Sequence, residues 1–285
     1  MLLILLTVPR FLPCFHSMTP PQPQSLAGKV LVVIGGTTGI GSSAVRAFLA
    51  AGAKVVAVGL DPESCKAAQE TFKQNCVCLC ADARDPQTAP QAVSRAVSEF
   101  GSFSGLYHVA GGSGRRWGDG PLHEITDEGW RATIDLNLTS VMYSNRTAVR
   151  RFLAQGSGGT ILNTGSVLAS SPSPRHFSTH AYSAAKAALE GWTRSCAAYY
   201  APSNIRFNLI VPGLIATPMS SRAQQDAAVT GFVKHKQPLA GGGIGQPEHL
   251  DSAALYFMGD GSGFTTGQVL EVDGGWSVSE GIPRA

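Results

Sequence analysis

The sequence predicts an α/β fold in which a doubly wound parallel sheet carries helices on both faces within a single domain. Short apolar segments alternate with longer helical segments over most of the 285 residues. The first apolar segment, residues 30–34, is uniformly apolar and rich in β-branched side chains, as strands buried on both faces are. A glycine-rich turn follows it directly and leads into a helix, which is how a βαβ unit of such a sheet begins.

The remaining elements follow the same alternation. A helix at residues 42–51 ends at Gly52, and the second strand is expected at residues 54–58. Later strands are expected at residues 77–81, 106–110, 160–163 and 206–211. Later helices are expected at residues 62–73, 86–100, 126–154 and 182–200. Strands that alternate with helices in this way form a parallel sheet that binds ligands at the carboxyl ends of its strands.

Composition excludes several classes of partner. The formal net charge is +3, only 14% of the residues are charged, and no basic stripe with interleaved aromatic residues is present, so nucleic acid is not expected as a partner. Apolar residues at 44% and 33 glycines are typical of a turn-rich α/β protein rather than a disordered one.

Residues 1–25 are expected to lie outside the domain, which would occupy residues 26–285. The first eight residues, MLLILLTV, are too few to span a membrane and follow no positively charged segment. The extension is either a weak signal sequence or interfacial anchor, or an over-extended start that precedes a true start at Met18. The second alternative is favoured because the match to a signal peptide is poor, so no membrane partner is expected.

The cysteines suggest a reducing compartment. Cys76, Cys78 and Cys80 alternate along an expected strand and share one face of it. A metal site needs a fourth ligand and a tetrahedral geometry, so small buried core residues are the favoured interpretation, and no metal site is expected. The six cysteines form no disulfide framework, which favours a cytoplasmic location.

Ser166, Tyr182 and Lys186 form a candidate proton-transfer centre. Tyr182 and Lys186 are four residues apart in an expected helix, so both side chains lie on one face, one turn apart. A nearby ammonium favours the phenolate and brings the tyrosine pKa closer to neutrality. A polarising hydroxyl from Ser166 would complete a centre that reduces carbonyls or oxidises alcohols. An isolated Tyr-x-x-x-Lys match is more often a plain helix surface, so the context decides.

The glycine turn supplies part of that context. Gly35, Gly39 and Gly41 lie between the first strand and the first helix, where glycine lets the backbone approach a pyrophosphate. An ordinary glycine-rich turn is the alternative.

From Leu26 to its end, the chain resembles the short-chain dehydrogenase/reductase family, whose fold is a Rossmann-type sheet. The glycine motif, Asp82, the pair Pro212-Gly213 with Thr217, and the segment Val272-Asp-Gly-Gly275 match landmarks of the family. The four catalytic positions are matched by Asn137, Ser166, Tyr182 and Lys186. The resemblance implies cofactor contacts from Gly35, Gly39, Ile40, Gly41, Asp61, Asp82, Ala110, Gly111, Tyr182, Lys186, Pro212, Gly213 and Thr217.

The resemblance implies an oxidoreductase that transfers a hydride between a nicotinamide cofactor and a small secondary alcohol or ketone. Tyr182 would act as the general acid or base, and Lys186 would lower its pKa and bind the nicotinamide ribose. Ser166 would stabilise the oxyanion, and Asn137 would anchor a water-linked proton path. The expected partner is a second copy of the chain, in a homodimer or homotetramer. The alternative function is a catalytically silent dinucleotide-binding sensor or scaffold.

The chain departs from the family pattern at two places. Ile34 replaces the threonine that usually precedes the glycine motif. His108 and Val109 replace a pair of asparagines after the fourth strand. His108 is either a catalytic base or a structural histidine, and the second is favoured because the four matched residues already supply the proton chemistry.

The choice between NAD and NADP is open, with a slight preference for NAD. The second strand ends in Val58-Gly59-Leu60-Asp61, with no acid at the usual position and no arginine after the glycine. Thr38 occupies the place where some NADP enzymes carry an arginine. Asp61 is the acid nearest to the ribose, and no base is placed to bind a 2'-phosphate.

The sequence leaves the substrate unidentified. Arg115 and Arg116, after the fourth strand, would attract a carboxylate or a phosphate, although a solvated surface pair is the favoured interpretation. The segment 219–237 has no strong apolar periodicity and is expected to form a mobile helix-loop lid.

Overall fold

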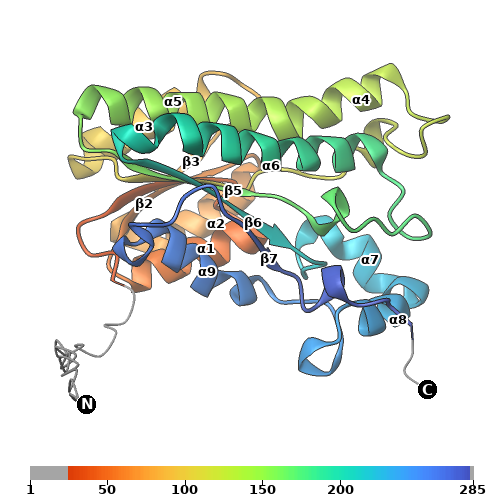
Figure 1. Cartoon of the computed structure of the whole chain (residues 1–285). Coiled ribbons are helices and arrows are strands. Elements are labelled where there is room, and N and C mark those ends of the chain that lie inside the picture. The colour runs from red at the N-terminus through yellow and green to blue at the C-terminus, as the bar shows by residue number, and fades with distance from the viewer. Residues whose placement is uncertain (1–24, 283–285) are drawn as a thin grey trace, which may run out of the picture.

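A computed structural model describes residues 25–282. Its centre is a parallel sheet of seven strands in the order β3-β2-β1-β4-β5-β6-β7 (Figure 1). The strands are β1 (Val30–Ile34), β2 (Lys54–Gly59), β3 (Cys76–Cys80), β4 (Gly105–His108), β5 (Gly159–Thr164), β6 (Ile205–Pro212) and β7 (Val269–Val272). The chain reverses direction across the sheet between β1 and β4, so the predicted doubly wound fold is confirmed.

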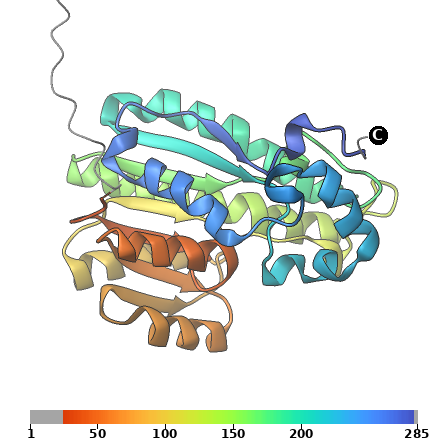
Figure 2. The same cartoon turned by 90° about the horizontal axis from the view of Figure 1, so that it is seen from below.

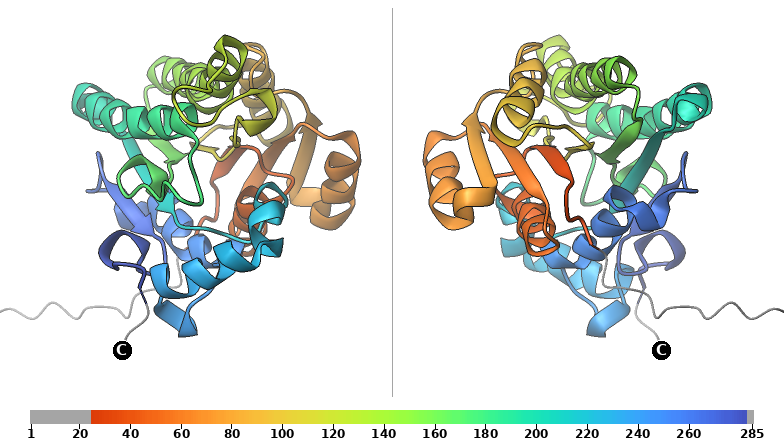
Figure 3. Two further views of the ribbon diagram at one scale, coloured as in Figure 1. Left: turned by 90° about the vertical axis from the view of Figure 1, so that its right-hand side faces the viewer. Right: turned by 90° about the vertical axis from the view of Figure 1, so that its left-hand side faces the viewer.

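Helices cover both faces of the sheet. Figure 1 shows one layer above the sheet and another below it, and Figure 2 shows the lower layer from beneath. The upper layer contains α3 (Thr88–Phe100), α4 (Asp127–Ile134), α5 (Ser140–Gln155) and α6 (His180–Tyr200). The lower layer contains α1 (Gly39–Ala50), α2 (Pro62–Phe72) and α9 (Asp251–Met258). Two helices, α7 (Ser221–Gln225) and α8 (Ala227–Lys236), lie beside the carboxyl ends of the strands, which Figure 3 shows from the end of the sheet.

The alternation of side chains along β1 explains the two layers. Val30, Val32 and Ile34 belong to the core beneath the upper helices, whereas Leu31 and Val33 belong to the core beneath α1 and α9. All five are buried. Successive side chains of a strand point to opposite faces, so a strand covered on both faces must be apolar throughout.

The expected single helix at residues 126–154 is interrupted by a π-helical turn. The turn spans Asp135–Thr139 and joins α4 to α5 without a break in the helical path. Asn137 lies inside it and is completely buried. Short π-helical turns are common at functional sites because the extra residue changes the direction of a side chain. The hydrophobic pattern of the helix does not reveal such a turn.

The expectation that Cys76, Cys78 and Cys80 are all buried is wrong. Strand β3 is the edge strand of the sheet, and burial declines along it from the buried Cys76 to the exposed Cys80. The sequence predicts a strand here, but it does not predict that the last residue of the strand is exposed. Cys14 lies outside the described residues.

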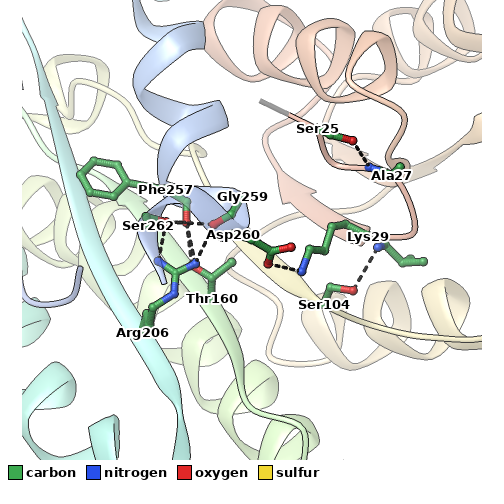
Figure 4. A network of polar contacts seen from close by, with 11 residues as sticks. Ser25, Ala27, Lys29, Ser104, Thr160, Arg206, Phe257, Gly259, Asp260 and Ser262 are labelled. Carbon is green, nitrogen blue, oxygen red and sulfur yellow. Dashed lines mark hydrogen bonds and ion pairs between the residues drawn. The ribbon is translucent and has the colours of Figure 1, made fainter. Parts of the chain in front are cut away.

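A polar network joins the start of β6 to the end of α9 (Figure 4). Arg206 of β6 donates to the carbonyl oxygens of Phe257 and Gly259 at 3.0 and 3.3 Å, and to the hydroxyl of Ser262 at 2.7 Å. These groups lie at the end of α9, where carbonyl oxygens lack partners within the helix. The side chain of Lys29 also pairs with Asp260.

The expected extension at residues 1–25 falls almost entirely outside the described residues, of which Ser25 is the first. Within residues 25–282, no helix is both long enough and apolar enough to cross a membrane.

Candidate active site

A cavity of about 360 Å³ opens at the carboxyl ends of the central strands. Its walls come from the segments that follow β4, β5 and β6, from the first turns of α6, from α7, and from Trp276. Among the residues expected to act in catalysis or cofactor binding, eight line it: Ile40, Gly111, Ser166, Tyr182, Lys186, Pro212, Gly213 and Thr217. A parallel sheet of this kind binds its ligands at this edge.

Ser166, Tyr182 and Lys186 meet in this cavity, and all three are buried. The Ser166 hydroxyl is near enough to Tyr182 to lower the pKa of its phenol, against the effect of burial. The Lys186 ammonium lies 5.7 Å from the centre of the Tyr182 ring and donates to the carbonyl oxygen of Thr164 at 2.8 Å. Ser166 follows β5, whereas the other two lie one turn apart on α6, so the sheet and the helix together assemble the group.

The expected lowering of the Tyr182 pKa by Lys186 is not present in the described protein. Burial raises the pKa of Tyr182, and the Ser166 hydroxyl offsets part of that rise. Burial also lowers the pKa of Lys186 to about 8. Both side chains lose water in the same cavity, and this desolvation is the largest cause of each shift.

Asn137 is held rigidly against the segment after β4. Its amide nitrogen donates to the carbonyl oxygens of Gly112 and Thr133, and its amide oxygen accepts from the Gly112 N–H, each at 2.9 Å. A Cβ atom on Gly111 would lie 2.8 Å from the Asn137 oxygen and 3.2 Å from the Lys186 ammonium. Asn137 and Lys186 are therefore neighbours, and only glycine fits between them.

Asp119 is a site residue that the sequence analysis missed. It is buried, and its two carboxylate oxygens accept from the N–H groups of Ala181 and Tyr182 at 3.0 Å each. It therefore caps the start of α6 from a loop about 60 residues away in sequence, beside the tyrosine itself. No local pattern signals such a long-range cap.

The glycine turn has the shape needed to bind a dinucleotide. A Cβ atom on Gly41 would lie 1.9 Å from the Gly35 carbonyl oxygen, and one on Gly39 would lie 2.9 Å from Thr217. At Gly35 the same atom would lie 2.6 Å from the Ala110 nitrogen. Helix α1 starts at Gly39 with no side-chain cap and no acid in its first turn. Its N-terminal N–H groups therefore remain available to a pyrophosphate, and the residues fit this cofactor group.

The expected ribose contact Asp61 and the expected adenine contact Asp82 lie outside the cavity lining, at the ends of β2 and β3. Asp61 caps α2 by accepting from the Ser64 N–H at 2.8 Å. Asp82 forms a two-pronged ion pair with Arg84, which holds the pKa of its carboxyl below the usual value. Both carboxylates therefore already accept hydrogen bonds from protein groups.

The missing acid at the end of β2 has a steric explanation. A Cβ atom on Gly59 would lie 2.2 Å from the Thr37 hydroxyl and 2.8 Å from the Cys65 sulfur. No side chain fits at this position unless Thr37 moves. Beside Gly59, the end of β2 therefore carries the Thr37 hydroxyl rather than an acid.

His108 is a buried, neutral residue. One ring nitrogen lies 2.7 Å from the Ser144 hydroxyl and the other 3.1 Å from the Ala110 carbonyl oxygen. Burial, with a smaller contribution from Lys186, lowers its pKa to about 3. The ring joins the end of β4 to α5 and does not line the cavity, which favours the structural interpretation over a catalytic one.

The rest of the cavity lining contains apolar and cationic side chains. The apolar wall consists of Leu168, Phe177, Leu214, Met219 and Trp276. The cationic residues are Arg115, Arg116 and Arg222, the last of which lies on α7. The interpretation of Arg115 and Arg116 as a simple surface pair is thus incomplete, because both are exposed to solvent and both also line the cavity.

The expected lid consists of α7 and α8. Although the pattern of its sequence is weak, Ala223, Val229 and Val233 are buried and pack into the same core as Trp276.

Comparison with known proteins agrees with this geometry. A sequence profile of the family described as "Enoyl-(Acyl carrier protein) reductase" matches residues 35–277. The chain is 35% identical to 3beta-hydroxysteroid dehydrogenase 2 of Eggerthella lenta, over 89% of this chain and 96% of that protein. It is 32% identical to cis-4-hydroxycyclohexanecarboxylate dehydrogenase of Sinomonas cyclohexanicum, over 90% of this chain and 99% of the relative.

Solved structures give the same result. A short-chain type dehydrogenase/reductase from Mycobacterium ulcerans superimposes with a TM-score of 0.82 and 29% identity, over 90% of this chain and 92% of that one. The profile match, the relatives and the shared fold all extend over nearly the whole described region. The chain therefore belongs to the short-chain dehydrogenase/reductase family.

Proposed function

We propose that this protein transfers a hydride between a nicotinamide cofactor and a secondary alcohol or ketone, with Tyr182 as the general acid and base. The family is one of NAD(P)-dependent oxidoreductases, and the relatives compared above are named as dehydrogenases. The main support for the residue roles is the meeting of Ser166, Tyr182 and Lys186 in one buried cavity beside the glycine turn. A sensor or scaffold without chemistry has no comparable support.

The residues divide the work of the reaction. Tyr182 gives its phenolic proton to the carbonyl oxygen during reduction and takes the hydroxyl proton during oxidation. Ser166 donates a hydrogen bond to the same oxygen as negative charge develops on it. Lys186, mostly protonated at neutral pH, supplies the positive charge that favours the phenolate when the site loses a proton. The cofactor, when bound, supplies or accepts the hydride at the carbon.

Asn137 and the glycine turn position the groups that react. Asn137 holds the Gly111-Gly112 segment next to Lys186, which excludes a side chain from the space beside the ammonium. Gly35, Gly39, Gly41 and the start of α1 would hold the pyrophosphate, with Thr217 next to Gly39. The neutral end of β2, with Thr37 and without a base, supports NAD rather than NADP.

Three further assignments belong to the same proposal. Residues 1–25 lie outside the domain formed by residues 26–285. The protein works as a homodimer or homotetramer. It works in the cytoplasm, which the free thiols of the five described cysteines support.

Replacement of Tyr182 by phenylalanine tests the assignment of the general acid. The ring still fills its place, but the proton is gone, so the rate of turnover is expected to fall by a factor of about 100 or more. Cofactor binding should stay within twofold of the wild-type value, measured by the fluorescence of bound NADH. Tyr199→Phe is the matched control, because that tyrosine is largely exposed. Full turnover by Tyr182→Phe would refute the assignment.

A further inference from the structure

The cationic residues of the cavity have no counterion among the described lining residues. Arg115, Arg116 and Arg222 line the cavity together with Lys186, and no acidic residue is among the lining residues that the structure describes. Within residues 25–282, no ion pair joins Arg115 or Arg222 to a carboxylate. Arg116 instead stacks on Trp117 at 4.0 Å.

Arg115 and Arg222 are close enough to repel one another. The pKa of Arg115 is lowered, first by burial and then by the charge of Arg222. Asp119 attracts Arg115 weakly, but both of its oxygens already accept from the N–H groups at the start of α6. Two guanidinium groups that face one cavity without an ion-pair partner within residues 25–282 form a site suited to an anion.

Within residues 25–282, the only hydrogen bond of the Arg115 side chain joins it to the segment between Ser166 and α6. Its guanidinium donates to the carbonyl oxygen of His176 at 3.5 Å, and His176 belongs to the segment between Ser166 and α6. The pyrophosphate cradle lies elsewhere, at the glycine turn and Thr217. Neither arginine belongs to the glycine turn or to the group formed by Ser166, Tyr182 and Lys186.

The apolar wall restricts the chemistry of the rest of the ligand. Leu168, Phe177, Leu214, Met219 and Trp276 offer no partners for a row of hydroxyl groups, which would lose water without compensation. The ring of Trp276 packs against Phe177 at 5.9 Å, which gives the wall a fixed shape. The cavity measures about 360 Å³, near the lower end of the range for ligand pockets, which favours a small ligand.

We propose that the substrate is a small apolar, ring-sized secondary alcohol or ketone that carries a carboxylate, and that Arg115 and Arg222 bind this carboxylate. This inference rests on the proposed function for the alcohol or ketone, but the anion site stands independently of it. The apolar body lies against the Phe177 and Trp276 wall, while the carbinol carbon faces Tyr182. Arg222 lies on α7, so this helix contributes to specificity.

Calorimetric titration tests the site without any need for turnover. Cyclohexanecarboxylate is titrated into the protein saturated with NADH, or with NADPH if only that cofactor binds, and cyclohexanecarboxamide serves as the neutral analogue of equal shape. The carboxylate is expected to bind at least 10-fold more tightly than the amide. Arg222→Met and Arg115→Met should each weaken carboxylate binding about 10-fold and leave amide binding unchanged. Arg222→Lys should recover part of the loss.

Arg95→Met is the matched control, since Arg95 lies on α3 and pairs only with Glu99. It should leave both ligands unaffected. Equal affinity for acid and amide, or undiminished carboxylate binding by Arg222→Met, would overturn the proposal. A parallel loss of cofactor affinity in Arg222→Met would also overturn it, because that arginine would then serve the cofactor phosphates. If the carboxylate binds as expected but no ketone is reduced, the anion site stands and the proposed hydride transfer fails.

Discussion

Lys186, Tyr182 and His108 are all buried, and burial makes the largest contribution to the pKa of each. For Lys186 and Tyr182 the consequence is functional. The pKa of the lysine falls to about 8 and that of the tyrosine rises, so both protons remain in place at neutral pH in the described protein. The site is therefore set to donate a proton, and a positive charge brought in with an oxidised cofactor would favour its release.

The burial of His108 can be tested by measuring the stability of the protein at acidic pH. Its pKa is about 3 in the folded protein and 6.5 when unfolded, so the unfolded chain takes up a proton as the pH falls below 6.5 and the folded protein does not. Relative to His108→Asn, the wild type should lose about 1.4 kcal/mol of unfolding free energy per pH unit between pH 6 and 4.

Urea unfolding of both proteins at pH 7, 5 and 4 measures this difference. The exposed His123 provides the control, and His123→Asn should follow the wild-type profile. A difference between wild type and His108→Asn that does not change with pH would show that His108 is not held neutral.

At the residue scale, the sequence predicted what short spacings encode. Tyr182 and Lys186 were placed together by helical periodicity, and Ser166 by its position after a strand. Asp119 was missed because its hydrogen bonds reach 62 and 63 residues along the chain. Arg222 lies in the segment predicted to form a lid, but no role was predicted for it, because its position near Arg115 depends on the path of α7. Local patterns carry no information about either contact.

The start of α6 is the element on which the site depends most directly. Asp119→Ala removes the acceptors of the Ala181 and Tyr182 N–H groups, which then remain buried and unpaired. We expect a loss of about 2 kcal/mol of stability, together with a lower kcat, because Tyr182 is no longer held in place.

Chemical unfolding and steady-state kinetics of Asp119→Ala and Asp119→Asn measure both effects. Asparagine keeps one acceptor oxygen, so it should recover a substantial part of stability and of kcat, while KM for the cofactor stays near the wild-type value. The exposed Asp127, at the first position of α4, is the matched control. If Asp119→Ala is as stable and as active as Asp127→Ala, the carboxylate does not position α6.

The π-helical turn at Asp135–Thr139 illustrates why element boundaries were less predictable than element types. The pattern at residues 126–154 correctly predicts a helix, but the extra residue at Asn137 is stabilised by contacts with Gly112 and Thr133 and leaves no trace in the periodicity. The sequence analysis predicted neither strand β7 nor helix α9. In β7, Leu270 and Glu271 are exposed, so the segment lacks the continuous apolar run that identifies a central strand.

At the scale of the whole molecule, cofactor choice can be read from stability. A ligand that binds only the folded state at about 100 times its dissociation constant adds about 2.7 kcal/mol to the free energy of unfolding. In thermal unfolding at equal concentrations, NAD and NADH should raise the melting temperature more than NADP and NADPH, because the end of β2 carries no base for a 2'-phosphate.

The variant Leu60→Arg tests whether the end of β2 determines the choice of cofactor. Leu60 is 59% exposed and directly follows Gly59, so an arginine there would supply the base that the end of β2 lacks. The preference should move toward NADP and NADPH. A larger shift with NADPH in the wild type would contradict the assignment of NAD.

The overall fold was predictable because one pattern, a strand followed by a helix, repeats along the chain. Every expected strand is present, and the alternation with helices correctly implied parallel pairing throughout. The exposure of Cys80 was not predictable, since the alternation does not show which strand lies at the edge. The cavity itself depends on how the segments after β4, β5 and β6 meet, and the sequence gives only their composition.

Transfer of deuterium from a reduced nicotinamide labelled at C4 to a ketone is the most direct test of the proposed function. Wild-type protein, supplied with 4-oxocyclohexanecarboxylate and with cyclohexanone in separate reactions, should yield an alcohol with deuterium on the carbinol carbon, detected by mass spectrometry. Tyr182→Phe should bind the same cofactor and yield almost none. A labelled alcohol formed at the same rate by the variant, or tight cofactor binding with no label in either product, would contradict the account.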